Sequence, residues 1–180
     1  MKRTVKNKEI VAGCQADKPE SQRQLYDKYC GLVFGIALRY TQNTTDAEDI
    51  AQDAFVKIFI NIKQLHDGNA ITSWIKSITT NAALDFLKLK NNNPHIVPLD
   101  DLTTDIADVY CENYETIPEA KLLKFIQELP DGYRTVFNLC AIDGYKQEEI
   151  AKMLGCSHAN VRSQYFKAKK ALKEKIENYE

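Results

Sequence analysis

The segment at residues 145–172 constrains the fold most, because it predicts two helices joined by a short turn. Gly155 is placed to end the first helix, and the Ser157 hydroxyl can cap the second by accepting a backbone N–H. The second helix has apolar residues at helical spacing for burial: Val161, Tyr165, Ala168 and Leu172. This arrangement is typical of a helix-turn-helix, which places its second helix in the major groove of DNA.

The other faces of that second helix are polar and basic. They carry His158, Asn160, Arg162, Ser163, Gln164, Lys167, Lys169 and Lys170. Arginine and lysine can bind phosphates or guanine edges, and glutamine or asparagine can bind adenine. The alternative interpretation is an amphipathic basic helix within a helical bundle, without DNA binding.

The distribution of charge fits a DNA-binding end. The net charge is only −1, but residues 91–120 contain seven acidic residues and no Lys or Arg. Residues 146–176 contain eight basic and three acidic residues, a net charge of +5. A basic end attracts phosphate, and an acidic middle repels it.

Composition disfavours several other classes of protein. No apolar run approaches the roughly 20 residues that a membrane span needs, so we expect no membrane insertion. Five scattered cysteines without a CxxC motif, and three histidines without metal spacing, predict a reduced cytoplasmic protein that binds no metal. No Gly-rich phosphate loop or Ser-His-Asp set can be assembled, so we predict neither an enzyme nor a cofactor.

The rest of the chain is also predicted to be helical. Helical periodicity extends over residues 20–40, 45–62, 71–90, 118–128 and 131–141, and no strand-like alternation of useful length appears. Thr45 and Glu48 have the spacing of a capping box at the start of one helix. We therefore predict an all-α fold of two small domains, residues 1–90 and 118–180, joined by an acidic linker at residues 91–117.

One predicted helix, at residues 46–62, has a second face besides its core stripe. The residues Asp46, Asp49, Asp53, Val56 and Ile60 recur at helical spacing opposite the core. An acidic and partly apolar stripe of this kind suits docking on a basic protein surface. The alternative is a solvated acidic face with additional core contacts.

The predicted helix at residues 71–90 has a polar side that can contact nucleic acid. Its core stripe consists of Ile71, Ile75, Ile78, Ala82 and Phe86. Its polar side carries Ser73, Lys76, Ser77, Thr80, Asn81 and Lys88. Trp74 lies at the edge of the stripe, where it can stack on a base; the alternative is a core tryptophan at a domain edge.

Four stretches resemble, in the expected order, a bacterial RNA polymerase sigma factor of the sigma-70 class, extracytoplasmic-function (ECF) subfamily. They lie at residues 25–59, 71–88, 129–155 and 157–172. The most specific part is DAEDIAQDAFVKIF at residues 46–59, followed by SWIKSITTNAALDFL at residues 73–87. The resemblance implies a transcription initiation factor that binds core RNA polymerase and directs it to promoters.

The resemblance also implies roles for individual residues. Docking on the polymerase would use Asp46, Glu48, Asp49, Gln52, Asp53 and Val56. The loop at residues 64–70 and the following helix would capture the −10 element during strand opening, through Asn69, Ser73, Trp74, Lys76, Ser77, Thr80 and Asn81. The helix-turn-helix would bind the −35 element as duplex, through His158, Asn160, Arg162, Ser163, Gln164, Phe166, Lys167 and Lys170.

The implied partners are core RNA polymerase, promoter DNA and an anti-sigma factor. The acidic linker would thread toward the active-site and RNA-exit channels of the polymerase. The sequence departs from the family pattern at Ser77, Thr80 and Gln164, where arginine is common. Two other hypotheses remain: a free-standing helix-turn-helix regulator with a sensing N-terminal half, and a decoy that binds polymerase without promoter function.

Overall fold

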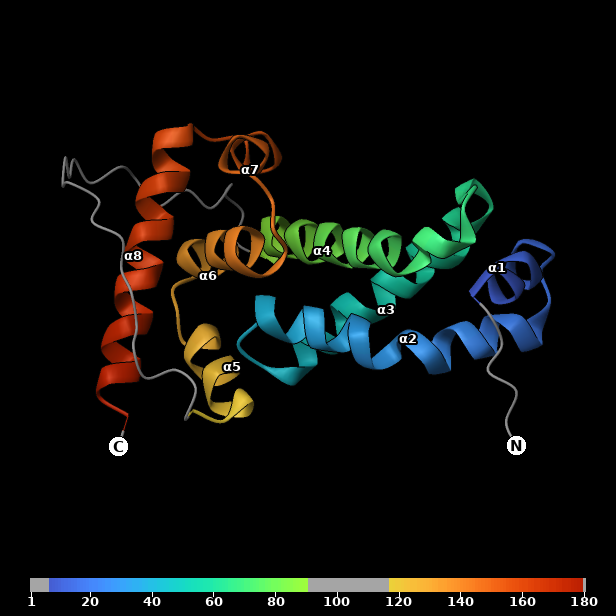
Figure 1. Cartoon of the computed structure of the whole chain (residues 1–180), viewed down its shortest axis with the longest axis horizontal. Coiled ribbons are helices and arrows are strands. Elements are labelled where there is room, and N and C mark those ends of the chain that lie inside the picture. The colour runs from blue at the N-terminus through green and yellow to red at the C-terminus, as the bar shows by residue number, and fades with distance from the viewer. Residues whose placement is uncertain (1–6, 91–116, 180) are drawn as a thin grey trace. The chain divides into compact units, whose positions relative to one another are not determined.

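The structure, a computed structural model, describes residues 7–90 and 117–179, and every regular element within them is helical (Figure 1). The predicted all-α class is confirmed. The chain divides into two compact units, Met1–Leu87 and Lys88–Glu180. Of the predicted linker at residues 91–117, only Ile117 is among the described residues. None of the helices that the structure describes is long and apolar enough to cross a membrane.

The first unit is built on a helical hairpin. Its elements are α1 (Asn7–Gln15), α2 (Pro19–Tyr40), α3 (Thr44–Asn61), the 3-10 turns η1 (Ile62–Gln64) and η2 (Gly68–Ala70), and α4 (Ile71–Lys90). Helix α2 packs against both α1 and α3 (Figure 1). The side chains of Leu25, Val33, Ile50, Ile58 and Ile75 are almost completely buried and form the core.

Helix α3 begins one residue before the predicted start, with a different cap. The Asn43 side chain accepts a hydrogen bond from the Asp46 N–H at 2.8 Å, and its own amide donates to the Asp46 carboxylate at 2.9 Å. The predicted capping box at Thr45 and Glu48 is therefore wrong. Asparagine is at least as good an N-cap as threonine, and Asn43 comes first in the chain.

Helix α4 buries a wider face than the sequence predicted. Ile71, Ile75 and Ala82 are buried as expected, whereas Ile78 and Phe86 are only half-buried. The additional buried residues are Thr79, Thr80, Ala83, Leu84 and Leu87. The Thr79 hydroxyl donates to the Ile75 carbonyl at 2.8 Å, which satisfies this polar group inside the core.

The second unit is centred on one long helix. Its elements are α5 (Glu119–Gln127), α6 (Asp131–Phe137), the π-helical turn η4 (Asn138–Ile142), α7 (Gln147–Leu154) and α8 (His158–Glu177). Helix α8 packs against α5, α6 and α7. Its Ala168 and Leu172 form a core cluster with Phe125 and Leu129.

A buried arginine fixes the turn between α5 and α6. Arg134 is only 1% exposed, and its Nη1 donates to the carbonyl oxygens of Gln127 at 2.9 Å and Leu129 at 2.8 Å. Its Nη2 pairs with the Asp131 carboxylate. Burial lowers the pKa of Arg134, and the Asp131 charge opposes that shift. The burial of Arg134 was not predicted from the sequence.

Candidate functional site

The outer face of α3 exposes large apolar side chains among carboxylates. Val56 is 56% exposed and Ile60 is 71% exposed. Among the predicted docking residues, Glu48, Asp49, Gln52 and Asp53 are also exposed, while Asp46 is half-buried at the start of the helix. Apolar side chains grouped on an exposed surface mark a contact site for another molecule.

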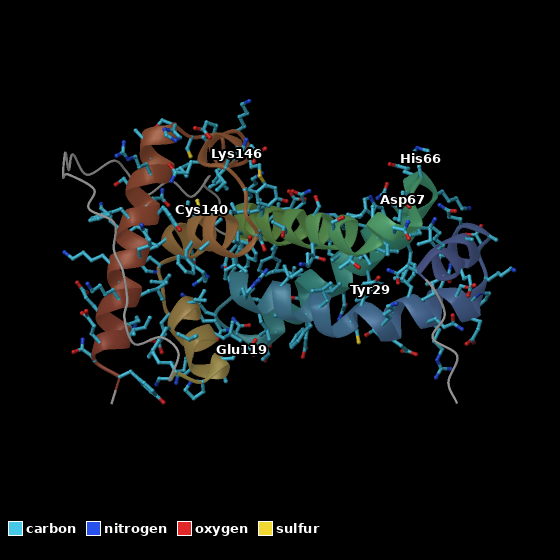
Figure 2. All side chains as sticks on the ribbon, viewed as in Figure 1. Tyr29, His66, Asp67, Glu119, Cys140 and Lys146 are labelled. Carbon is cyan, nitrogen blue, oxygen red and sulfur yellow. The ribbon has the colours of Figure 1, made fainter. Side chains whose placement is uncertain are left out.

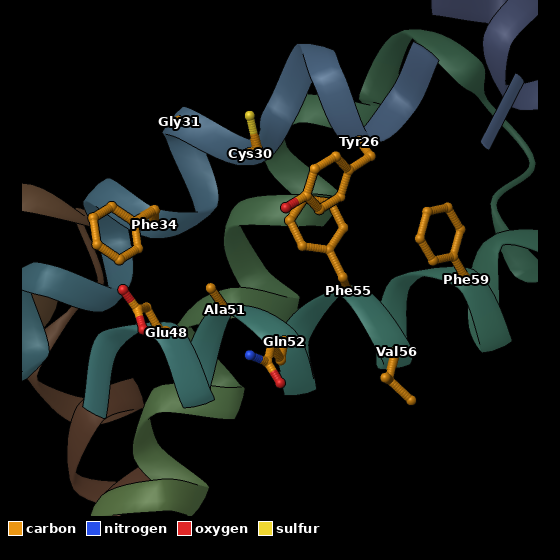
Figure 3. A pocket seen from close by; sticks show the side chains of 10 residues that line it. All are labelled: Tyr26, Cys30, Gly31, Phe34, Glu48, Ala51, Gln52, Phe55, Val56 and Phe59. Atoms are coloured by element: carbon orange, nitrogen blue, oxygen red, sulfur yellow. The ribbon is translucent and has the colours of Figure 1, made fainter. Parts of the chain in front are cut away.

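An apolar groove lies beside this face, between α2 and α3 (Figure 3). Its volume is about 750 Å³, and its lining residues are Tyr26, Cys30, Gly31, Phe34, Glu48, Ala51, Gln52, Phe55, Val56 and Phe59. The rings of Tyr26 and Phe55 lie 4.6 Å apart between centroids, and those of Phe55 and Phe59 lie 6.1 Å apart. We use the name docking surface for this groove together with the α3 outer face (Asp46, Asp49, Asp53, Val56 and Ile60).

The contribution of α2 to the docking surface was not predicted from the sequence. Tyr26, Cys30 and Phe34 are spaced four residues apart, which places them on one side of a helix. That spacing was available as a signal, but it lies next to the core stripe of Leu25 and Val33 and looks like part of it. The structure separates the two stripes, because Leu25 is fully buried while Tyr26 is 49% exposed.

Lys57 connects the docking surface to α4. Its Nζ lies 2.9 Å from the Asp53 carboxylate on the same helix and 3.0 Å from the Asp85 carboxylate on α4. The hydrogen bond to Asp53, followed by the one to Asp85, raises the pKa of Lys57 despite partial burial. The Asp53 carboxylate is therefore held in place by its own helix and remains half-exposed to a partner.

Two 3-10 turns precede α4, and the second of them, η2, lies within the predicted loop at residues 64–70. The Asp67 carboxylate accepts from the Asn69 N–H at 2.9 Å, and the Asp67 carbonyl accepts from the Ala70 N–H at 3.0 Å. His66, Asp67 and Asn69 are exposed, whereas Leu65 and Gly68 are buried. His66 and Asp67 lie at the tip of the loop (Figure 2). Of these residues, only Asn69 was predicted from the sequence to contact DNA. His66 and Asp67 are exposed beside it.

The predicted DNA-contacting residues of α4 differ in exposure. Ser73, Lys76 and Asn81 are exposed, and Trp74 and Ser77 are half-buried. Thr80 is only 2% exposed, so its predicted place on the polar side is wrong. Thr80 lies one residue beyond the buried Thr79, on a core face that is wider than the apolar residues alone predict.

The turn between α7 and α8 forms as the sequence predicted. Gly155 has a φ of +65°, in the left-handed region that favours glycine, and the next N–H, of Cys156, donates to the Ala151 carbonyl at 2.9 Å. The Ser157 hydroxyl accepts from the Asn160 N–H at 3.1 Å and caps α8. His158 approaches Glu148 of α7, with Nε2 to Oε1 at 3.6 Å.

Two of the predicted DNA-contacting residues of α8 are buried. Asn160 is 4% exposed and Gln164 is 5% exposed, so the expectation that they face outward is wrong. The Gln164 amide donates to the Asn160 side chain, and both lie against the rest of the unit. Gln164 falls between Val161 and Ala168 at spacings of three and four residues, which is the core stripe itself.

The other predicted residues of α8 remain accessible. His158, Arg162 and Lys170 are exposed, and Ser163, Phe166 and Lys167 are half-buried. Tyr165, which was expected in the core, is also half-buried; its ring lies 6.3 Å from that of Phe137. The exposed side of α8 is therefore narrower and more basic than the sequence indicated.

Three of the described cysteines have thiols that are made less reactive by burial. Burial raises the pKa of the Cys140 thiol to about 11 and also raises the pKa of Cys14 and Cys156. A thiol reacts as its thiolate, so these three groups stay protonated near neutral pH. Within residues 7–90 and 117–179, no three His, Cys, Asp or Glu side chains are grouped to hold a metal ion.

Two sigma-70 families match this chain, one in each unit. The family Sigma-70 region 2 matches residues 25–92, and the family Sigma-70, region 4 matches residues 119–172. Together the two segments cover about two thirds of the 180 residues.

Individual proteins match over most of the chain. The RNA polymerase sigma-H factor of Pseudomonas aeruginosa is 27% identical over 164 residues, which cover 83% of each chain. The ECF RNA polymerase sigma-E factor of Escherichia coli strain K12 is 25% identical over an alignment of 185 positions, gaps included. The alignment covers 93% of each chain.

Two solved structures share the fold. CnrH in complex with the cytosolic domain of CnrY has a TM-score of 0.52 at 20% identity, over 98% of this chain and 100% of that one. The sigma factor RpoE from Bartonella quintana, in complex with the anti-sigma factor NepR, has a TM-score of 0.53 at 17% identity, over 88% of this chain and 98% of that one.

The chain belongs to the sigma-70 family of RNA polymerase sigma factors, in its ECF group. It is a transcription initiation factor that binds core RNA polymerase and directs it to specific promoters.

Proposed function

We propose that this sigma factor divides promoter recognition between its two units. The α7–α8 helix-turn-helix binds the −35 element as duplex, and the loop at residues 62–70 with the exposed side of α4 captures the −10 element as it opens. The observation that carries the proposal is the presence of a separate polar surface in each unit. The basic exposed side of α8 suits duplex DNA, and the exposed tip at residues 66–69 suits an unstacked base.

Polymerase binding is proposed for the docking surface. A partner helix with apolar anchors would fill the groove between α2 and α3, and basic residues beside those anchors would meet the carboxylates of α3. The residues in this role are Asp46, Glu48, Asp49, Gln52, Asp53 and Val56, joined by Tyr26 and Phe59 from the groove. Asp53 suits this role because Lys57 already fixes its carboxylate.

The −10 element is proposed to contact one continuous polar surface. It begins at the loop tip with His66 and Asn69 and continues along α4 through Ser73, Trp74, Lys76, Ser77 and Asn81. Half-buried Trp74 keeps part of its ring accessible for stacking on a base. Thr80 is proposed to support α4 from inside instead of contacting DNA.

The −35 element is proposed to contact the first four turns of α8. Arg162 is the main candidate for a base contact, with His158, Ser163, Phe166, Lys167 and Lys170 beside it. Arginine can donate two hydrogen bonds to a guanine edge, which is the commonest specific contact in the major groove. Asn160 and Gln164 are proposed to hold the start of α8 in place.

The remaining roles follow from this mode of action. Binding and positioning, without covalent chemistry of its own, are sufficient for an initiation factor, so the protein is proposed not to be an enzyme. Its place of action is proposed to be the cytoplasm, where the polymerase and the chromosome are. An anti-sigma factor is a proposed partner, because the RpoE protein that shares this fold was solved in complex with the anti-sigma factor NepR.

Run-off transcription with purified core polymerase tests the proposal. The full-length protein is mixed with core polymerase and a promoter library that is randomised separately at the −35 and −10 positions. The expected result is transcription from a subset of templates, with a sequence preference at both elements. Tight DNA binding without polymerase association would indicate a free-standing regulator. Polymerase association without initiation on any template would indicate a decoy.

A further inference from the structure

Helix α1 is bonded to the loop at residues 62–70 through a single side chain. The Gln15 amide nitrogen donates to the Ile62 carbonyl at 3.1 Å and to the Leu65 carbonyl at 2.8 Å. Leu65 directly precedes the exposed tip, and Ile62 begins the 3-10 turn that leads to it. Both hydrogens of one amide group therefore fix the entry to the tip, from a residue about 50 positions away in the chain.

A close backbone contact fixes the other side of the tip. Gly68 is buried, and a Cβ atom placed on it would lie 2.9 Å from the Lys8 Cα atom. Real side chains do not tolerate that separation from a backbone atom without a shift of one segment. The loop thus approaches α1 so closely because residue 68 is glycine.

Further contacts attach α1 to the start of α4. The Tyr29 hydroxyl lies 3.2 Å from the Thr72 hydroxyl and 3.4 Å from the Asn7 side-chain oxygen. Asn7 begins α1, and Thr72 lies in the first turn of α4. An exposed ion pair between Lys63 and Asp17 at 2.7 Å adds little by itself, because water screens it.

We propose that α1 braces the loop at residues 62–70 in the shape that captures a −10 base, and that Gln15 is a positioning residue for this capture. The inference rests on the role proposed above for the loop. Removing a base from the stack is unfavourable, so its pocket must be formed in advance for the remaining binding energy to select a sequence. The tip residues His66, Asp67 and Asn69 are exposed, and Figure 2 shows the first two of them. In this proposal the brace keeps them exposed and makes no contact with DNA itself.

The test uses full-length protein in holoenzyme with core polymerase, on duplex promoters randomised at the −10 element. Open-complex formation is measured for each −10 base. Gln15→Leu keeps the size of the side chain but removes both hydrogen bonds. Gly68→Ala keeps the hydrogen bonds and disturbs only the contact with Lys8. The matched control is Gln24→Leu, because the Gln24 amide bonds only to Glu20 within α2.

Gln15→Leu is expected to reduce discrimination at one −10 position by about threefold to tenfold, the range for one to two lost hydrogen bonds. Gly68→Ala is expected to reduce discrimination at the same position, because it pushes the loop away from Lys8. Affinity for core polymerase and preference at −35 should stay at the level of the control. An equal loss on every −10 sequence, or unchanged −10 discrimination in both folded variants, would overturn the brace. If the unaltered protein itself shows no −10 preference, the proposed function fails instead. Should Gln15→Leu lose its helical circular dichroism, Gly68→Ala decides the result alone.

Discussion

Arg134 shows how strongly one residue can determine the stability of a small helical unit. The guanidinium is buried, and its partners are two backbone carbonyls and the Asp131 carboxylate. These contacts close the turn between α5 and α6, on which α8 packs. A charge in such a position is tolerated only while its partners satisfy it.

We expect Arg134→Ala to destabilise the second unit by about 3–5 kcal/mol, because it leaves Asp131 and two carbonyls without their donor. Urea unfolding followed by circular dichroism measures this loss. Arg162→Ala, an exposed change in the same unit, is the control and should stay within about 0.5 kcal/mol of the unaltered protein. Equal stability of the two variants would contradict the structural role of Arg134.

Arg162 and Lys170 allow base contact and phosphate contact to be separated on one helix. We expect Arg162→Ala to weaken discrimination at one −35 position by about 1–3 kcal/mol. Lys170→Ala should weaken binding evenly across sequences. It should also reduce the slope of the logarithm of the binding constant against the logarithm of salt concentration by about 1. Competition binding of holoenzyme to −35 variants at several salt concentrations measures both. Unchanged −35 preference after Arg162→Ala would remove that residue from its proposed role.

At the scale of elements, α3 has a buried side and an opposite side for which polymerase binding is proposed. Its inner side, with Ile50, Ala54 and Ile58, forms the core, and its outer side belongs to the docking surface. Changes confined to the outer side can therefore alter binding while the helix stays folded.

The double change Asp49→Lys and Asp53→Lys is expected to abolish association with core polymerase, because it replaces two exposed carboxylates by like charges facing a basic partner. Co-elution of the two components measures association, and circular dichroism checks that the helices persist. The matched control carries Glu9→Lys and Glu20→Lys, the same change in net charge at exposed positions outside the docking surface. Loss of association in both proteins would indicate a nonspecific effect of charge.

Local rules predicted the end of α7 and the cap of α8 well, because one residue type determines the geometry at each of these positions. They missed α1 and misplaced the cap of α3. Gly155 and Ser157 lie where predicted, because only glycine adopts a left-handed φ easily and a serine before a helix caps it. Other errors concern polar residues inside core stripes. Thr80, Asn160 and Gln164 were expected outside because polarity was taken as exposure. A hydrogen-bonded polar group can be buried, as the Gln164 amide nitrogen is against the Asn160 side chain.

The groove was harder to predict for a different reason. Its two walls come from helices whose residues are about 25 positions apart, and the sequence shows only two apolar stripes on α2 that lie next to each other. Which stripe faces the core depends on how α2 and α3 pack, and that is a property of the whole unit. The hydrogen bonds from Gln15 to Ile62 and Leu65 also join residues that are far apart in the sequence. No local sequence pattern predicts them.

At the scale of the whole molecule, the proposal that each unit recognises one promoter element has a measurable consequence. Gln15 and Arg162 lie in different units and share no partner. The losses from Gln15→Leu and Arg162→Ala should therefore add in free energy, within about 0.5 kcal/mol, when both are combined. Open-complex formation is measured for four proteins: the unaltered protein, the two single variants and the double variant. Promoters altered at one or both elements serve as templates, and the four values form a double-mutant cycle. A larger deviation would mean that the two readers influence each other.

The exposed aromatic and aliphatic side chains of the docking surface also affect the solubility of the purified protein. Tyr26, Val56 and Ile60 face water around a groove of about 750 Å³. Such a surface promotes self-association when its partner is scarce. At high concentration the isolated chain should therefore scatter more light or elute as larger species in size-exclusion chromatography. Added core polymerase should reverse both effects. Solubility becomes a simple assay for occupancy of this surface, before any promoter has been identified.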